Sequence, residues 1–341
     1  MGKTFAMLFV SFIAIIIINF SWGIVNLYFF ISEGFQTIVV GSTFVENIVL
    51  STYLKWILLI DALWIIFALV FTYGRKSYKS DPSFHYLTYN KIDKPSLCVV
   101  IPAYNEEESI ERVVIEFKKQ DFVDNVLVVD NHSSDNTVNI AKKCGVNVIS
   151  KDRNLGYGHS WWIGLSEALK LDGNIIVIVD SDATYNAYDL QKMIPYLDNC
   201  DMVVGNRLVQ SLNESETQIN TFLAWGNAFI AKLFQIKYFN VRHLGIVHLN
   251  DVGCSFRCFR KESLKKIINE FKIPNTDKLA YGCNYITVGI FCTAKVIEKN
   301  LKIVEVPITF KKRAGKSKTD ASKLSNSLYY GFSIIWYILK S

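Results

Sequence analysis

Two long apolar segments lie near the start of the chain. Residues 6–30 and 47–73 are almost uninterrupted in hydrophobic residues, and each is longer than the roughly 20 residues with which a helix spans a bilayer. The first segment is too long for the apolar part of a signal peptide and lacks a small-residue cleavage site. The pattern therefore predicts two transmembrane helices, within a membrane anchor that covers residues 1–80.

Charges beside these segments predict their orientation. Lys3 precedes the first segment, and Arg75, Lys76 and Lys79 follow the second, whereas the residues between the segments contain no Lys or Arg. Positively charged flanks stay on the cytoplasmic side of a membrane. We therefore expect an integral membrane protein in which everything after about residue 80 faces the cytoplasm.

Beyond a polar linker, residues 81–95, short β-rich runs alternate with helical patterns. The pattern predicts strands at 97–101, 126–129, 146–149, 175–179 and 202–204, and helices near 107–117, 137–143, 161–169 and 190–197. Such alternation is typical of an α/β domain with a mostly parallel sheet and helices on both faces.

Unusual polar residues directly follow four of the predicted strands. The clusters are residues 102–106, Asp130, residues 180–182 and residues 205–207. In an open α/β sheet the carboxyl ends of the strands form the ligand crevice. The sequence therefore predicts that four separate clusters meet at one site.

Asp180 and Asp182 form a D-x-D pair after a buried strand. Paired carboxylates suit Mg²⁺ or Mn²⁺, which keeps several waters and takes its other ligands from one or two carboxylates and a substrate's phosphates. The alternative is a pair of solvated turn aspartates. Asp130 likewise has two interpretations, a hydrogen bond to the base or ribose of a nucleotide or a cap on the turn that follows it.

Composition and motifs exclude other classes of protein. Half of the residues are hydrophobic, 20% are charged and the formal charge is +6, which excludes a disordered, collagenous or disulfide-scaffold protein. Seven cysteines without a C-x-x-C pair indicate buried thiols in a reducing compartment. Gly156 and Gly158 lack the third glycine of a dinucleotide-binding motif, and there is no P-loop. We expect no nucleic-acid partner.

Seven strings of residues follow one another in a familiar order: VVIPAYNEEESI, VVDNHSSDNT, RNLGYGHSWWIG, VDSDATY, VGNRL, DVGCSFRCFRKESL and VEVPITFKKRAGKSK. In this order they resemble family-2 inverting glycosyltransferases of GT-A fold, and most of all the branch that loads sugars onto polyprenyl phosphates, such as dolichol-phosphate mannose synthase. The resemblance covers about residues 96–320 and implies a GT-A glycosyltransferase domain there.

The resemblance also implies roles for single residues. Those that would bind the nucleotide sugar are Pro102, Ala103, Tyr104, Glu106, Asp130, Asn154, Gly158, Asp180 and Ser181. Those that would neutralise the phosphates of donor and acceptor are Arg207, Arg257, Arg313, Lys316 and Lys318. The metal ligands would be Asp180 and Asp182, and the catalytic residues Asp182, Arg207 and Asp251. As an isolated charge run, residues 311–318 would instead form a solvated or lipid-facing patch.

The implied reaction is inverting, because the acceptor attacks the anomeric carbon opposite the leaving nucleoside diphosphate, whose charge the metal and the basic residues stabilise. A polyprenyl phosphate is already an anion and needs no strong base, whereas a sugar hydroxyl needs a carboxylate, for which Asp251 is the candidate. The alternative for Asp251 is a loop residue that orients Arg257.

Two departures from the family pattern qualify this interpretation. Ser160 stands where relatives usually have Ala, and no acidic residue lies between Asp277 and Glu298, where relatives commonly have Glu. The missing acid keeps open a different class of function, a catalytically silent nucleotide-binding scaffold at the membrane.

Two further segments predict contact with the membrane surface. Residues 219–236 and 324–339 are apolar and aromatic with polar interruptions, which favours interfacial helices; a buried core helix is the alternative for the first. Residues 321–341 are thus expected to form an amphipathic, membrane-interfacial segment.

The leading expectation is a membrane-bound enzyme, possible as a homo-oligomer, that moves a hexose from a GDP- or UDP-linked donor to a dolichyl or undecaprenyl phosphate on the cytoplasmic leaflet. The rival is a transferase that extends a lipid-linked saccharide with Asp251 as base.

Overall fold

The computed structural model describes residues 86–341 except 218, 220, 239–248, 277, 285–286 and 316–322, together with eleven isolated positions between residues 17 and 66. Most of the two predicted membrane segments therefore lies outside the described residues. Within the described part of the chain, no helix is both long and apolar enough to cross a bilayer. The chain divides into two compact units, Met1–Lys79 with Phe239–Leu244 and Ser80–Tyr238 with Gly245–Ser341.

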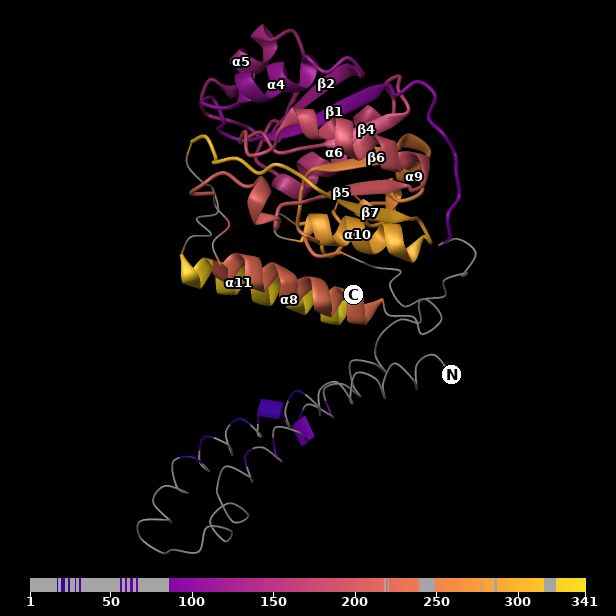
Figure 1. The fold of residues 1–341 in the computed structure, drawn as a ribbon. Helices are drawn as coiled ribbons and strands as arrows, with labels where there is room; N and C mark the ends of the chain where they lie inside the picture. The colour runs from indigo at the N-terminus through magenta and orange to yellow at the C-terminus, as the bar shows by residue number, and fades with distance from the viewer. Residues whose placement is uncertain are drawn as a thin grey trace, which may run out of the picture. The chain divides into compact units, whose positions relative to one another are not determined.

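The second unit is built on a seven-stranded sheet (Figure 1). Its strands, in spatial order, are β3 (Asn147–Ser150), β2 (Val123–Asp130), β1 (Leu97–Ala103), β4 (Ile175–Ile178), β6 (Arg257–Arg260), β5 (Met202–Asn206) and β7 (Ile303–Pro307). Only β6 runs antiparallel to its neighbours; the remaining pairs are parallel. The five predicted strands and the mostly parallel sheet are confirmed.

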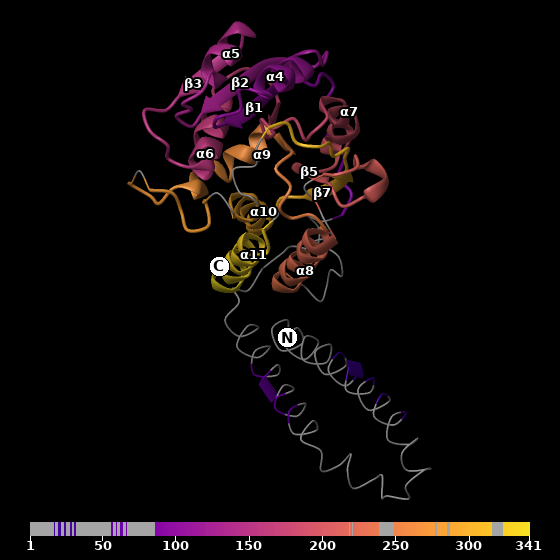
Figure 2. The ribbon, with the colours of Figure 1, turned by 90° about the vertical axis from the view of Figure 1, so that its left-hand side faces the viewer.

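Helices cover the sheet and continue beyond it. In chain order they are α4 (Ile110–Lys118), α5 (Thr137–Lys143), α6 (Tyr157–Ala168), α7 (Leu190–Met193), α8 (Thr221–Lys237), α9 (Lys261–Lys265), α10 (Val288–Glu298) and α11 (Leu324–Lys340). Short 3₁₀ turns lie at Ala187–Asp189, Ile194–Asp198, Gln210–Leu212 and Ile268–Phe271. Helix α4 packs on β2, and helix α6 packs on β1 and β2 from the opposite side of the sheet (Figure 2).

The strand β1 is buried along its whole length because it lies in the middle of the sheet with helices over it. A parallel strand covered on both faces reads as a continuous apolar run, which is why LCVVI is recognisable in the sequence. In the register of the sheet Ala103 pairs with Asp130, and Val100 pairs with Ile178. The carboxyl ends of β1, β2 and β4 therefore lie at one sheet edge.

Close packing of α6 on the sheet yields a test of this architecture. A Cβ at Gly164 would lie 2.3 Å from Val100 Cγ1 and 3.0 Å from Val129 Cγ2, whereas a Cβ at Gly226 in α8 would meet no atom within 4 Å. Gly164→Ala should therefore lower the free energy of unfolding by about 1–3 kcal/mol. The matched change Gly226→Ala should raise it, by up to about 1 kcal/mol. Urea denaturation of both variants measures this, and equal effects would contradict the packing.

Candidate active site

The loop after β1 is fixed to the loop after β2. Asn105, whose φ is 53°, donates its backbone N–H to Ser133 Oγ at 2.9 Å and accepts from the Ser134 N–H at 2.8 Å through its side chain. The Glu106 N–H donates to Thr137 Oγ1 at 2.8 Å. These bonds hold residues 102–106 beside the end of β2. Of the predicted donor-binding residues there, Pro102 and Ala103 are buried and Tyr104 is exposed.

Asp130 caps the turn that follows β2. Its carboxylate, only 2% exposed, accepts hydrogen bonds from the backbone N–H groups of His132 and Ser133, both at 3.2 Å. The capping interpretation is therefore the one observed in this structure, and contact with a base or ribose stays a prediction.

The loop at residues 156–158 is held in place by the side chain of Asn154 and by close packing. Asn154 Oδ1 accepts from the Gly156 N–H at 2.9 Å and from Asn131 Nδ2 at 2.8 Å. A Cβ at Gly158 would lie 2.0 Å from the Cys283 carbonyl oxygen, so this position needs glycine for packing against the backbone. The predicted residues Asn154 and Gly158 thus shape the loop that precedes α6.

Ser160, the departure from the family's alanine, contacts a buried ammonium group. Lys151, 8% exposed, donates to Ser160 Oγ at 2.8 Å and to the Gly156 carbonyl at 3.4 Å. Burial lowers the pKa of Lys151 to about 8, although the negative charge of Asp130 acts in the other direction. The serine therefore supplies a hydrogen-bond partner that an alanine would not.

The two D-x-D carboxylates lie at the end of β4 in different environments. Asp180 accepts a hydrogen bond from the Tyr157 hydroxyl, which lies 3.2 Å from Ser255 Oγ. Burial and the negative charge of Asp182 raise the pKa of Asp180 to about 6. Asp182 is 7% exposed, and its Oδ1 accepts from the N–H and the hydroxyl of Thr184, at 3.2 and 2.6 Å. Ser181 between them is also buried.

These carboxylates fit a metal ion only in combination with a substrate. No group of three or more His, Cys, Asp or Glu side chains in the described residues forms a possible metal site. Mg²⁺ bound with a nucleotide needs only one or two protein carboxylates, because phosphates and water complete its shell. The raised pKa of Asp180 indicates that its negative charge is incompletely compensated, which a divalent cation would relieve.

Arg313 joins two of the acidic clusters. Its Nη1 lies 2.6 Å from Asp182 Oδ2, and its Nη2 is hydrogen-bonded to Glu106 Oε1. Its Nε is buried without a hydrogen-bond partner. The loops after β1 and β4, two of the four clusters expected at one site, therefore meet, and the segment after β7 joins them. Lys316 and Lys318 lie outside the described residues.

Arg207 and Asp251 form a bidentate ion pair. Arg207 Nε and Nη2 lie 2.7 and 2.8 Å from the two oxygens of Asp251, and the Arg207 N–H also donates to this carboxylate. Asp251 has no exposed surface. Burial alone would lower the pKa of Arg207, but the negative charge of Asp251 keeps it well above its ordinary value. Asp251 thus orients Arg207, and not Arg257 as its structural alternative supposed.

Glu305 of β7 fixes the loop that carries Asp251. It accepts from the backbone N–H groups of Asn250 and Asp251, at 2.8 and 2.6 Å, and from Asn206 Nδ2 at 3.1 Å. Burial raises its pKa, while these hydrogen bonds oppose the rise. The carboxylate therefore connects the ends of β5 and β7 with Asp251.

The prediction that Arg257 binds phosphate needs correction. Arg257 is fully buried in β6, where its guanidinium donates to the carbonyls of Cys254 and Val252, at 2.8 and 2.9 Å, and to Thr293 Oγ1 at 2.8 Å. A guanidinium enclosed in this way cannot face a ligand in the crevice. Arg257 instead shapes the loop between Asp251 and Ser255.

Four side chains of the site were missed by sequence reasoning: Tyr157, Thr184, Ser255 and Glu305. Glu305 alone left a signal, an acidic residue within the apolar strand IVEVP. The hydroxyl groups left none, because a serine or tyrosine in a loop has no pattern that marks its contacts.

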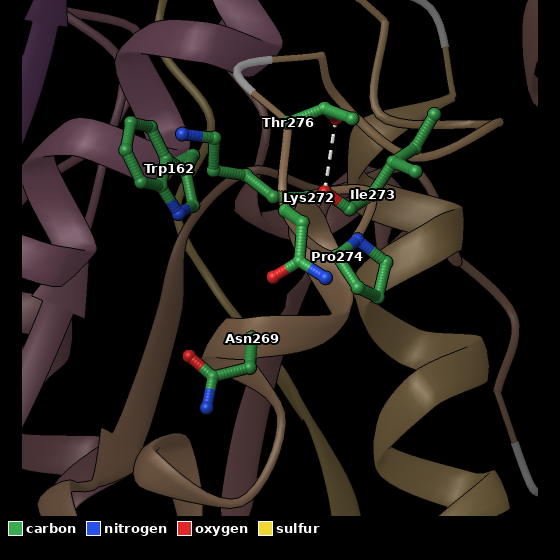
Figure 3. Close-up of a pocket in the computed structure, with 7 residues that line it drawn as sticks. Trp162, Asn269, Lys272, Ile273, Pro274 and Thr276 are labelled. Carbon is green, nitrogen blue, oxygen red and sulfur yellow. Dashed lines mark hydrogen bonds between the residues drawn. The ribbon is translucent and has the colours of Figure 1, made fainter.

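A surface cavity of about 490 Å³ lies apart from these residues (Figure 3). It is lined by Trp162 of α6 and by residues of the 269–276 segment, with Lys272 Nζ 4.2 Å from the centre of a Trp162 ring. None of the predicted site residues lines it, so we give it no part in donor binding.

Comparison with known proteins agrees with this geometry. The family model "Glycosyl transferase family 2" matches residues 98–268. The chain belongs to this glycosyltransferase family. The match ends before β7, so the segment that carries Glu305 and Arg313 lies beyond it.

Relatives and a solved structure extend the comparison. An uncharacterised protein of Methanocaldococcus jannaschii is 32% identical over 64% of this chain and 83% of its own length. The polyprenol monophosphomannose synthase of Mycolicibacterium smegmatis is 27% identical over 68% of this chain and 83% of its own length. The crystal structure of glucosyl-3-phosphoglycerate synthase of Mycobacterium tuberculosis, with Mn²⁺, UDP and phosphoglyceric acid, matches with a TM-score of 0.50 at 19% identity. The match covers 72% of this chain and 78% of the synthase chain. The fold of this glycosyltransferase is accordingly the GT-A fold.

The ion pair of Arg207 and Asp251 predicts a strong coupling in stability. Asp251→Asn leaves a largely buried guanidinium without its counter-charge, so it should lower the free energy of unfolding by about 3 kcal/mol or more. Arg207→Gln should also destabilise the protein, and the double variant should lose clearly less than the sum of the two. Urea denaturation of the three variants gives the coupling energy; additive losses would show that the pair is not the unit described.

Proposed function

We propose that this family-2 glycosyltransferase moves a hexose from a GDP- or UDP-linked donor to a polyprenyl phosphate at the cytoplasmic leaflet. The observation that carries the proposal is the state of Asp251, the candidate base. Both of its oxygens accept hydrogen bonds from Arg207, and no part of it is exposed. A carboxylate held in this way is poorly placed to take a proton from a sugar hydroxyl.

A phosphate acceptor removes the need for such a base. A phosphomonoester oxygen is already negative at neutral pH and can attack the anomeric carbon directly. The rival function, extension of a lipid-linked saccharide, requires proton removal by a side chain and gains no support from Asp251. The relative named polyprenol monophosphomannose synthase agrees with the phosphate acceptor.

Two arginines of the site could bind the phosphates of the two substrates. Arg207, oriented by Asp251, and Arg313, between Glu106 and Asp182, present two guanidinium groups at the carboxyl end of the sheet. Guanidinium groups bind phosphate oxygens in a bidentate manner and stabilise the charge that develops on a leaving diphosphate. The acceptor would attack from the side opposite this diphosphate, so the product should have inverted stereochemistry.

Asp180 and Asp182 are the residues that would hold Mg²⁺ or Mn²⁺, which when bound would neutralise charge on the donor's diphosphate. Tyr157 keeps Asp180 in place through its hydroxyl, and Thr184 does the same for Asp182. These contacts fix the carboxylates before any ligand arrives, which favours preorganised charge stabilisation.

Two observations support a position at the membrane. Nine of the isolated described positions between residues 17 and 66 are large apolar residues in helical conformation, and all nine are 48–70% exposed. Water disfavours such a surface, whereas lipid accepts it.

The second observation is the pair of helices α8 and α11, which pack side by side (Figures 1 and 2). Helix α11 buries Tyr337 and Ile338 but exposes Phe332 and Trp336 by 67 and 62%. Helix α8 buries Phe234, so the core alternative holds for one of its sides, yet Phe229 on it is 41% exposed. An amphipathic helix with exposed aromatic residues suits a bilayer interface.

The proposed reaction is tested with membranes that contain the protein. Given Mg²⁺ or Mn²⁺, a polyprenyl phosphate and labelled GDP- and UDP-sugars in turn, they should form an organic-extractable sugar phosphate with one donor. Asp182→Asn should reduce this by about a hundredfold or more, because it removes a charge at the diphosphate. The control Asp121→Asn changes an exposed aspartate before β2 and should leave the rate unaltered. Label found only in water-soluble glycan would refute the lipid-phosphate acceptor.

The exposed face of α11 yields a separate prediction. Residues 80–341 should bind vesicles that contain anionic lipid, and the double change Phe332→Glu/Trp336→Glu should weaken this binding by more than about tenfold, because each aromatic side chain contributes about 1.5–3 kcal/mol when buried. Tyr188→Glu, at an aromatic residue 58% exposed elsewhere, is the control. Vesicle sedimentation measures the binding; equal loss in the control and the α11 variant would count against an interfacial α11.

A further inference from the structure

We infer that the guanidinium of Arg313 takes the place of the metal ion when the D-x-D site is empty. It pairs with Asp182 and Glu106 until the donor and its metal ion bind, and it then moves to pair with the donor's phosphates. This inference rests on the proposed function, because it concerns the same metal and donor. It adds a regulatory step: the empty site carries its own counter-ion, so metal binding depends on the presence of donor.

The contacts of Arg313 put it where a metal ion would compete with it. Its Nη1 lies 2.6 Å from Asp182 Oδ2, and its Nη2 contacts Glu106 Oε1. The other oxygen of Asp182, Oδ1, already accepts two hydrogen bonds from Thr184. Oδ2 is therefore the oxygen through which Asp182 would bind a metal, and a divalent ion there would displace the guanidinium.

An unsatisfied donor on the same side chain favours transfer to an anion. Arg313 Nε is buried and has no hydrogen-bond partner in the part of the chain that the structure describes. A buried N–H group without an acceptor is costly and is normally paired in a native state. A phosphate group is a suitable acceptor, because two of its oxygens can accept from the Nε and one Nη of a guanidinium in parallel. The side chain is thus only partly satisfied by the two carboxylates.

The exchange needs no movement of the backbone. The Lys311 N–H donates to the Thr184 carbonyl at 2.7 Å, and the Ala314 N–H donates to the Asp182 carbonyl at 3.1 Å. The chain on both sides of Arg313 is thereby attached to the D-x-D turn itself. A rotation of the long side chain suffices to carry the guanidinium from Asp182 to a diphosphate bound beside that turn.

Charge explains why the donor would drive the exchange. Without ligand, Arg313 and a metal ion repel each other at Asp182, so each weakens the binding of the other. With a nucleoside diphosphate present, both cations find negative oxygens, and the repulsion is replaced by shared attraction. Removal of Arg313 should therefore tighten metal binding when the donor is absent and should not tighten it when a nucleoside diphosphate is bound.

The test measures Mn²⁺ binding by full-length protein in detergent, from the electron paramagnetic resonance signal of free Mn²⁺. Arg313→Gln should bind Mn²⁺ alone about tenfold more tightly than the wild type, a coupling of ordinary size. With saturating UDP or GDP, whichever binds, the same variant should bind Mn²⁺ no more tightly than the wild type. Lys312→Gln, which removes the same charge from the exposed neighbour paired with Glu216, should change neither affinity.

Equal or weaker binding of Mn²⁺ alone by Arg313→Gln would overturn the inference. If that variant does not fold, Arg313→Lys serves instead, because an ammonium group cannot hold two carboxylates as a fork. Arg313→Lys should bind Mn²⁺ alone about threefold more tightly than the wild type. The transfer assay separates the two claims. If the wild type forms the sugar phosphate but Arg313→Gln does not bind Mn²⁺ alone more tightly, only the role of Arg313 is refuted. If Arg313→Gln binds Mn²⁺ alone more tightly but the wild type transfers no sugar to polyprenyl phosphate, only the proposed acceptor is refuted.

Discussion

Negative charge gathered at the carboxyl end of one sheet is the constraint on which this structure depends. Glu106, Asp182 and Asp251 are buried at this edge, Asp180 is partly buried, and the negative charge of Asp182 raises the pKa of Asp180. Arg313 compensates Glu106 and Asp182, and Arg207 compensates Asp251. Within the described residues Asp180 is hydrogen-bonded to the hydroxyl groups of Tyr157 and Ser255, and burial together with the negative charge of Asp182 raises its pKa. An added cation would therefore stabilise Asp180 more than the carboxylates that already have an arginine partner.

Most of the fold could be predicted because it follows from local patterns. The buried strands are apolar runs, and the loops after them carry the polar clusters, so both the parallel sheet and the common edge were evident in the sequence. The antiparallel strand β6 was not predicted. It inserts between β4 and β5 from a distant part of the chain, and no local spacing encodes a pairing of that kind.

The roles of the arginines could not be predicted, because burial depends on long-range packing. Arg207 and Arg257 both belong to recognised strings, and both have the residue type that binds phosphate. Yet Arg207 follows β5 at the open edge, whereas Arg257 lies inside β6 against the Trp161 ring, 5.6 Å from its centre. The same difference in burial decides which arginine pairs with Asp251, because only Arg207 reaches it. A sequence motif fixes residue types, but only the packing decides which of them face a ligand.

A residue at each departure from the family pattern contacts a buried cation. Ser160 supplies a hydrogen bond to buried Lys151, and Thr293, in the stretch without acidic residues, supplies one to buried Arg257. The guanidinium of Arg257 is thus satisfied, within the described residues, by a neutral network of two carbonyls and one hydroxyl. The hydrogen bonds that join Glu106, Asp180, Asp182 and Arg313 to one another and to Tyr157 and Thr184 involve neither Ser160 nor a residue of this stretch. The absent acid is therefore weak support for a silent scaffold, since the groups that would bind the diphosphate do not depend on it.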